Sequence, residues 1–148
     1  MREILFRGKQ SDTGEWVEGF LLKVTIDGKS AYLIFGDNFC FDGSDVKALS
    51  HALVDPSTVC QFTGMRDRNG KRVFEGDVVV FRESKYAVEW VEKYCRFSGR
   101  NEGTVFAGFS FDRCEVIGNI HESEPLEVTP HWQPLSETPG EEGGRGDL

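Results

Sequence analysis

The stretch TGMRDRNGKRVFEGDVVVF, residues 63–81, contains the strongest local structural signals in this sequence. Asn69-Gly70 separates two runs rich in β-forming residues, and this dipeptide is typical of a hairpin turn. Asn tolerates a positive φ and Gly has no Cβ, so both residues suit the centre of such a turn. Gly76-Asp77 interrupts the second run and predicts a bend before the buried strand at 78–81. The stretch therefore predicts antiparallel β-structure.

Similar turn signals divide the first 36 residues. Asp12-Thr13-Gly14 and Asp27-Gly28 separate runs in which apolar and polar residues alternate, as they do in half-buried strands. We therefore expect a small meander of three or four strands in this part. After residue 58 the β pattern returns and continues to a last strand in CEVIGNIHE, residues 114–122.

Residues 37–58 allow two interpretations. Val46, Leu49 and Leu53 have the spacing of one helix face, which favours a short helix that begins at Ser44 or Asp45. The same stretch ends in HALVDP, which equally suits a strand that runs into an Asp-Pro turn. A residue before proline disfavours the helical region. Both alternatives stay open from the sequence alone.

The sequence as a whole predicts a mostly β protein with two small β subdomains. We expect an N-terminal β meander at residues 1–58 and a C-terminal, barrel-like subdomain at 59–122, for which an SH3-like barrel is one candidate. The chain's 12 Phe, 3 Tyr and 3 Trp supply large side chains for a packed core. Residues 123–148 are rich in proline and acidic residues, so we expect a flexible acidic tail.

Charge is distributed unevenly along the chain. Residues 1–60 carry a net −3, residues 61–100 carry +3 and residues 101–148 carry −8, for a formal net charge of −8. An acidic protein repels phosphate backbones, which disfavours non-specific nucleic-acid binding. Only the basic middle region supports nucleic acid as a partner.

The cysteine pattern and the N-terminus indicate the compartment. Cys40, Cys60, Cys95 and Cys114 form no C-x-x-C pair, so zinc-ribbon and thioredoxin-like sites lack their usual signal. MREILFRGKQ, residues 1–10, lacks the apolar segment of a signal peptide, and no apolar run is long enough to cross a bilayer. We therefore expect a protein with free thiols in a reducing cytoplasm, without membrane association.

Three segments together resemble the YopX family of phage and prophage proteins. They are EILFRGKQSDTGEWVEGFLL at residues 3–22, VDPSTVCQFTGMRDRNGKRVFEGDVV at 54–79 and EVIGNIHES at 115–123. The resemblance covers roughly residues 2–124. Cys60 stands where the family often has Gly, and Met65 and Val73 replace similar apolar residues.

The resemblance implies a β-rich protein with two small β subdomains that is encoded in a phage or prophage. It implies no established enzymatic activity and no cofactor, so no catalytic residue is transferred to this chain. Residues after Pro125 lie outside the resemblance.

The basic cluster around the Asn69-Gly70 turn is a candidate interaction site. Its cations could contact phosphate or an acidic partner. Charge that keeps a hairpin tip soluble, with local ion pairs to neighbouring carboxylates, is the interpretation we favour. The candidate interaction hairpin comprises Arg66, Asp67, Arg68, Asn69, Gly70, Lys71, Arg72, Glu75 and Asp77.

Glu75 and Asp77 could in principle perform acid–base chemistry or hold a divalent cation. No third ligand is spaced nearby, and an Asp at a turn usually accepts hydrogen bonds from its own backbone. We therefore expect a structural role for both carboxylates and no metal site.

The histidines also give little support for a metal site or a catalytic site. His51, His121 and His131 have no metal-binding spacing. A dyad such as Cys60 with His51 requires that the fold bring the two together, and no charged neighbour in the sequence activates Cys60. The tripeptide Arg145-Gly146-Asp147 is attributed to chance.

Five aromatic residues of the N-terminal region could stack against the bases of a single-stranded nucleic acid. We favour a core role for them, because large apolar rings are usually buried and this region is acidic. They are Phe6, Trp16, Phe20, Tyr32 and Phe35.

The sequence therefore predicts a non-enzymatic phage or prophage accessory protein without a cofactor. We expect it to form a homo-oligomer, because small sheets leave unpaired edges, and to bind a host or phage protein through the 66–77 hairpin and the tail. The alternative is a nucleic-acid-binding β-barrel that uses the basic hairpin. An enzyme with an unfamiliar site is a third hypothesis.

Overall fold

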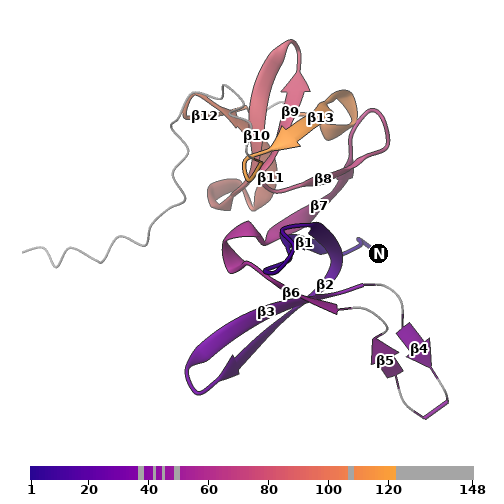
Figure 1. The fold of residues 1–148 in the computed structure, drawn as a ribbon. Coiled ribbons are helices and arrows are strands. Elements are labelled where there is room, and N and C mark those ends of the chain that lie inside the picture. Colours follow the sequence, from indigo (N-terminus) through magenta and orange to yellow (C-terminus); the bar gives the residue numbers. More distant parts are fainter. Residues whose placement is uncertain (37–38, 42, 45, 49–50, 107–108, 123–148) are drawn as a thin grey trace, which may run out of the picture.

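The structure of the protein is a computed structural model that describes residues 1–36, 39–41, 43–44, 46–48, 51–106 and 109–122. It is mostly β, as predicted, and consists of two antiparallel sheets and a separate hairpin (Figure 1). The first sheet has the strand order β6-β3-β2-β1-β7-β8, and the second has the order β12-β11-β10-β9-β13. The acidic tail predicted at 123–148, including the Arg145-Gly146-Asp147 tripeptide, lies outside the described residues.

Most strands are short, and turns separate them where the sequence predicts turns. The strands of the first sheet are β1 (Phe6–Lys9), β2 (Trp16–Ile26), β3 (Lys29–Phe35), β6 (His51–Val54), β7 (Cys60–Arg66) and β8 (Arg72–Phe74). The strands of the second are β9 (Asp77–Phe81), β10 (Ser84–Val91), β11 (Arg96–Asn101), β12 (Thr104–Val105) and β13 (Glu115–Asn119). The separate hairpin is β4 (Phe39–Phe41) and β5 (Val46–Ala48), and the 3₁₀ helices are η1 (Pro56–Thr58), η2 (Glu92–Tyr94) and η3 (Phe111–Arg113).

Where the structure describes the ambiguous segment at 37–58, the residues around Val46 and Leu53 form strands and not the short helix. β5 and β6 occupy most of the stretch in which the helical spacing occurs. Asp55 ends the strand β6 and caps η1, since its side chain accepts a hydrogen bond from the Ser57 amide at 3.0 Å. Pro56 supplies the fixed φ that suits the first position of a helical turn.

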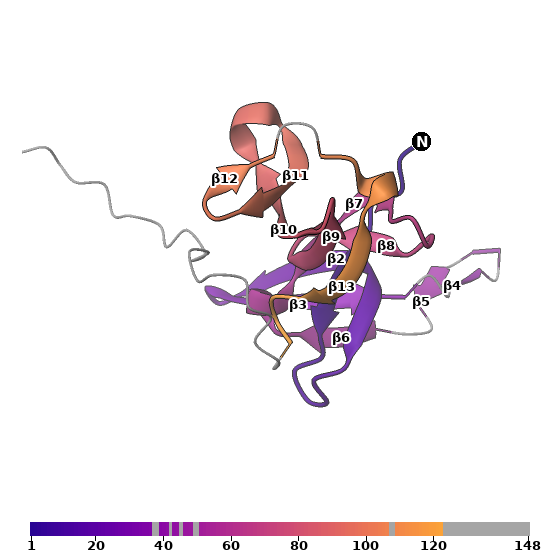
Figure 2. The same cartoon turned by 90° about the horizontal axis from the view of Figure 1, so that it is seen from above.

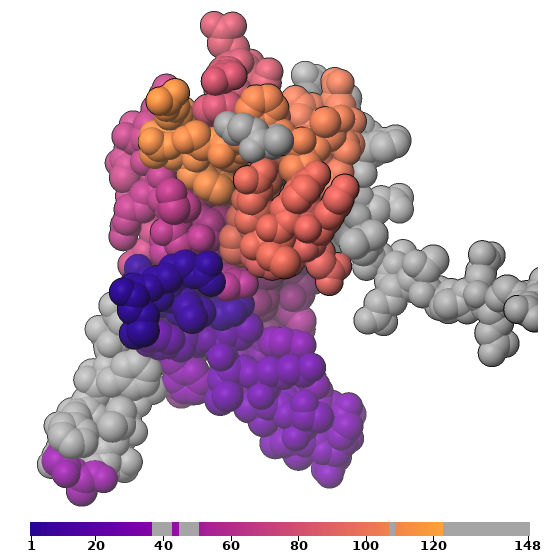
Figure 3. All heavy atoms as spheres, turned by 180° about the vertical axis from the view of Figure 1, so that it is seen from behind, coloured from indigo at the N-terminus to yellow at the C-terminus, as the bar shows by residue number. Residues whose placement is uncertain are grey.

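The strand β2 changes its pairing partner at Gly19. The first half of β2 pairs with β1 and ends at the pair Phe6 with Gly19, whereas the second half pairs with β3 from Phe20 onward. A Cβ at Gly19 would lie 1.9 Å from the Phe35 carbonyl oxygen, so only glycine fits this crossing point. Beyond Gly19, the β2–β3 hairpin projects from the body of the protein (Figures 1 and 3).

The second sheet carries the larger apolar core. Phe81, Val88 and Phe97 are buried against η3 and β13. Phe109 adds its ring at 5.2 Å from the ring centroid of Phe81. The sheet ends in β13, which follows η3 directly and pairs with β9. An SH3-like type of barrel stays a prediction.

The two sheets meet between β8 and β9. β7 belongs to the first sheet because Gln61 on β7 lies opposite Phe6 on β1, and β8 pairs with β7 in the same sheet. The sheets therefore divide at Glu75–Gly76, whereas the subdomain boundary at residues 58–59 stays a prediction. Viewed from above, β9 and β13 of the second sheet lie over the first sheet (Figure 2).

Candidate functional site

A buried ion pair joins the two sheets. Arg7 on β1 donates a hydrogen bond from Nη2 to Oδ1 of Asp77, the first residue of β9, at 2.5 Å. The second carboxylate oxygen of Asp77 accepts a hydrogen bond from the Phe74 amide at 2.8 Å. The guanidinium of Arg7 lies between the rings of Trp16 and Phe74, 4.8 and 4.7 Å from their centroids. Arg7 is therefore a structural cation that sequence reasoning missed.

The carboxylates at 75 and 77 have different environments. Burial raises the pKa of Asp77, although Arg7 opposes this effect, and Asp77 is 1% exposed. Burial also raises the pKa of Glu75, whose amide donates a hydrogen bond to the Gln61 carbonyl at 2.9 Å. The carboxylate of Asp77 is occupied by Arg7 and Phe74. Within the described residues, no cluster of three or more His, Cys, Asp or Glu side chains could hold a metal ion.

The fold brings Cys60 close to His121 and not to His51. Cys60 Sγ lies 3.6 Å from His121 Nε2 and donates a hydrogen bond to the Thr58 carbonyl at 3.2 Å. His51 instead lies against Phe35, with 5.7 Å between ring centroids. His131 lies outside the described residues.

The Cys60–His121 contact does not have the electrostatics of an activated dyad. Burial raises the pKa of the Cys60 thiol to about 11. Burial, together with the nearby cations of Arg7 and Lys9, lowers the pKa of His121. A catalytic thiolate requires the opposite shift of the thiol. The adjoining cavity of about 120 Å³ is also small for a substrate.

The tip of the candidate hairpin is built around Asp67. Its carboxylate accepts hydrogen bonds from the amides of Asn69 and Lys71 at 2.8 and 2.9 Å, and from the amide of Val116 on β13 at 3.0 Å. Gly70 has a φ of 80°, but Asn69 is not among the described residues with positive φ. The prediction that both turn residues adopt positive φ was therefore wrong, because Asp67 instead stabilises a wider turn that continues to Lys71.

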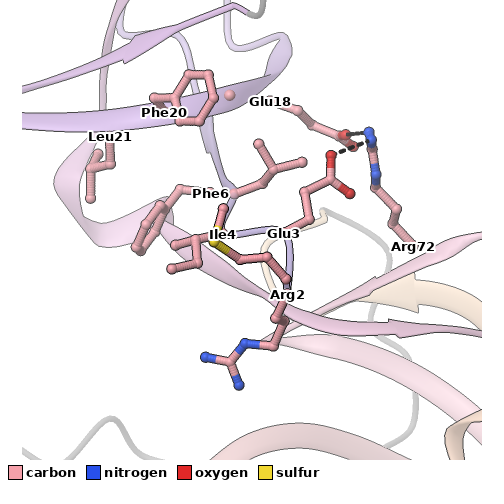
Figure 4. Close-up of a pocket in the computed structure, with 11 residues that line it drawn as sticks. Arg2, Glu3, Ile4, Phe6, Glu18, Phe20, Leu21 and Arg72 are labelled. Atoms are coloured by element: carbon pink, nitrogen blue, oxygen red, sulfur yellow. Dashed lines mark hydrogen bonds and ion pairs between the residues drawn. The ribbon is translucent and has the colours of Figure 1, made fainter.

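Most cations of the hairpin contact groups of the same chain. Arg66 donates to the Gly70 carbonyl at 2.9 Å, and Arg68 pairs with Glu115 on β13. Arg72 pairs with Glu3 at 3.2 Å and with Glu18 at 3.1 Å (Figure 4). The carboxylate partners lie on distant parts of the chain and not next to the turn, where the sequence analysis expected local ion pairs.

Lys71 is the exception among the four basic residues of the hairpin. It is exposed and makes no side-chain ion pair within the described part of the chain. A partner that binds the hairpin would therefore have to displace the contacts of the other three cations.

The five aromatic residues of the N-terminal region are not a buried core. Phe6, Trp16, Tyr32 and Phe35 are half-buried, and Phe20 is 48% exposed. The interpretation of these residues as core was therefore only partly correct.

An apolar surface on the first sheet was also missed. Leu22 lies opposite Leu33, and Leu33 lies opposite Leu53. Side chains of such directly opposed residues point to the same face. Leu22 is 47% exposed, and Leu53 is 52% exposed. We define the apolar face as Leu22, Val24 and Ile26 on β2, Leu33 on β3 and Leu53 on β6.

A groove lies beside this sheet where β1 and β2 separate. It has a volume of about 670 Å³ and is lined by residues 1–6, by residues 18–21 and by Arg72. Phe20 and Leu21 of β2 lie on one side, and Phe6 and Ile4 lie on the other (Figure 4). In the sequence, the alternation of apolar residues indicates the strand β2. It does not reveal that the core leaves the apolar side chains of β2 uncovered.

A model of the YopX protein family matches residues 5–126. The chain belongs to the YopX family. The match confirms the resemblance that the opening, central and closing segments of the sequence showed. Comparison with curated proteins gives no match.

The fold of this YopX family member is similar to a solved structure, the crystal structure of protein EF1440 from Enterococcus faecalis. The two share 24% sequence identity with a TM-score of 0.54, and the match covers 82% of this chain and 95% of that chain. At this identity the likeness shows the fold alone. No helix in the described residues has the length and apolar composition needed to cross a membrane.

Proposed function

We propose that this YopX family member is a non-enzymatic phage or prophage accessory protein that acts in the bacterial cytoplasm by assembling with further copies of itself. The apolar face is the observation that carries the proposal. Ile26 is 67% exposed, and Leu22 and Leu53 are each about half exposed. Contiguous exposed apolar residues usually mark an interaction surface, because each buried Å² of apolar area contributes about 25 cal/mol.

A second copy is the partner that this composition favours. The apolar face carries no charged residue, although Lys29 and His51 lie at its margin opposite Ile26 and Phe35. Permanent interfaces between identical subunits are more apolar than transient interfaces. An identical face on another copy supplies the matching apolar surface without any complementary charge.

The other hypotheses have less support. Binding of a host or phage protein through the 66–77 hairpin would require a partner that competes with Glu3, Glu18 and Glu115 for its arginines. The same pairing weakens the case for nucleic acid, which also has to overcome the net charge of −8.

A matched pair of substitutions tests the proposed assembly. Leu53→Glu places a charge on the apolar face, and Ile117→Glu does the same at a residue of β13 that is 40% exposed. Light scattering at tens of micromolar is expected to give a mass above the 16.7 kDa monomer for the wild type and for Ile117→Glu. Leu53→Glu is expected to be monomeric. A monomeric wild type would overturn the proposal, as would equal masses for the two variants.

A further inference from the structure

The outer edge of β2 lacks a strand partner. β2 pairs with β1 only at residues 16–19 and with β3 only at residues 20–26. Because β1 and β3 lie on opposite sides of β2, the β1 side is unpaired along residues 21–26 within the described part of the chain. Proteins usually protect such an edge with charges, proline or a bulge. Here the only charged residue in six is Lys23, and there is no proline.

The hydrogen-bonding pattern identifies the exposed backbone groups. The Gln10 amide donates a hydrogen bond to the Glu15 carbonyl. Because hydrogen-bonded pairs alternate along an antiparallel ladder, the odd-numbered residues of β2 direct their backbone amides and carbonyls toward β1. The Asp27-Gly28 turn has positive φ at both residues and closes on the pair Ile26 with Lys29, so even-numbered residues face β3. Leu21, Lys23 and Thr25 therefore direct their amides and carbonyls outward.

We infer that the unpaired edge of β2 pairs antiparallel with the same edge of a second copy, about a two-fold axis at Lys23. This inference rests on the proposed self-assembly and names its backbone contact. In this register, Leu22 lies opposite the partner's Val24, and Leu21 opposite the partner's Thr25. The apolar faces of the two copies then lie side by side as one continuous surface, because directly opposed residues share a face. This surface stays open for the face-to-face contact of the proposed function.

The groove beside β2 accommodates the partner's hairpin tip. Residue 20 lies opposite the partner's Ile26 in this register, so the partner's Asp27-Gly28 turn reaches the place where β1 and β2 separate. The groove there is lined by Ile4, Leu5 and Phe6, which suit the apolar side chain of the partner's Ile26.

The register places Lys23 opposite the partner's Lys23. Like charges directly opposite each other destabilise an antiparallel pair. A mixture of wild type with Lys23→Glu should therefore prefer mixed dimers, in which Lys faces Glu, over either homodimer. Native mass spectrometry of the mixture is expected to show mixed dimers above their statistical share. A statistical distribution would overturn the register.

Proline substitutions test the edge itself. Thr25→Pro removes an outward amide of β2, and Ser30→Pro is a matched control because Ser30 lies directly opposite Thr25 and points its amide away from β2. Both variants lose the 2.9 Å contact between the two hydroxyl groups. Thr25→Pro is expected to give a lower mass than the wild type, because only the contact between apolar faces remains, whereas Ser30→Pro keeps the wild-type mass.

The results separate this inference from the proposed function. If the wild type assembles and Leu53→Glu prevents assembly, but Thr25→Pro and Ser30→Pro both keep the wild-type mass, edge pairing is wrong and self-assembly through the apolar face stands. Edge pairing with an extended segment of another protein would give a monomeric wild type and would overturn both proposals.

Discussion

Arg7 and Asp77 are separated by 70 positions in the chain and form a buried ion pair between the two sheets. Arg7 is 8% exposed and Asp77 is 1% exposed. Both charges are largely removed from water, so each depends on the other for stabilisation. The Glu75-Gly76-Asp77 step is therefore the junction of the two sheets, and Asp77 holds them together there.

Loss of this cation should strongly destabilise the protein. Arg7→Met leaves the Asp77 carboxylate buried without its partner, which we expect to lower the free energy of unfolding by about 3–5 kcal/mol. Arg72→Met is the control, because it removes the exposed ion pairs to Glu3 and Glu18 and a cation–π contact with Phe62, and should cost about 1 kcal/mol or less. Urea denaturation measures both. Equal losses would show that the buried pair has no special role.

Asp67 should make the free energy of unfolding depend on pH in the acidic range. Burial alone would raise its pKa, but hydrogen bonds from the amides of Val116, Lys71 and Asn69 lower it below 3.8. A lowered pKa in the folded state means that the carboxylate contributes stability above 3.8 and loses it as pH falls through the folded value. We therefore expect Asp67→Asn to be less stable than the wild type at neutral pH.

The difference between the wild type and Asp67→Asn should shrink in acid. Urea denaturation at neutral pH and at successively lower pH values measures it. Arg66→Gln changes the same turn without removing the carboxylate and serves as the control. A difference that is constant with pH would contradict the assigned role of Asp67.

Gly19 should be irreplaceable. A Cβ there would lie 1.9 Å from the Phe35 carbonyl oxygen, so Gly19→Ala requires movement of the backbone. We expect a loss of more than about 3 kcal/mol in the free energy of unfolding. Gly14→Ala is the control, because Gly14 has a φ of +71° but open space around its Cβ position, and it should cost about 1 kcal/mol. Similar losses would contradict the crossing-point role of Gly19.

The thiols should differ in reactivity. Cys95 is exposed, whereas Cys60 and Cys114 are buried and burial raises the pKa of each to about 11. In a Cys40→Ser background, a disulfide reagent at mildly alkaline pH should modify Cys95 rapidly and the other two only after unfolding. Peptide mass spectrometry identifies the modified residue. Rapid modification of Cys60 in the folded protein would restore the hypothesis of a reactive Cys60–His121 pair.

Local signals in the sequence predicted much of the fold. The Asp27-Gly28 turn was predicted because its residues tolerate positive φ, and the structure contains it with φ values of 50° and 75°. The helix or strand ambiguity at 37–58 was not resolvable locally, since short apolar runs suit both. Tertiary pairing of β6 with β3 decides it.

The candidate site was less predictable, because its contacts are long-range. In the sequence, Arg7 is an ordinary basic residue of a strand. Only the fold places Asp77, which is 70 residues later, beside it. The cations of the 66–77 hairpin were identified correctly as a cluster, but their partners Glu3 and Glu18 lie on distant strands. The exposure of Leu22 and Ile26 depends on how much of the sheet is covered, which alternation alone does not specify.

The central claim is that the first sheet is a self-assembly surface, and the molar mass of the wild-type protein tests it most directly. Sedimentation equilibrium over a dilution series that reaches tens of micromolar measures this mass. The account predicts masses above 16.7 kDa that decrease on dilution or stay at a fixed multiple. A mass of 16.7 kDa at every concentration would contradict it.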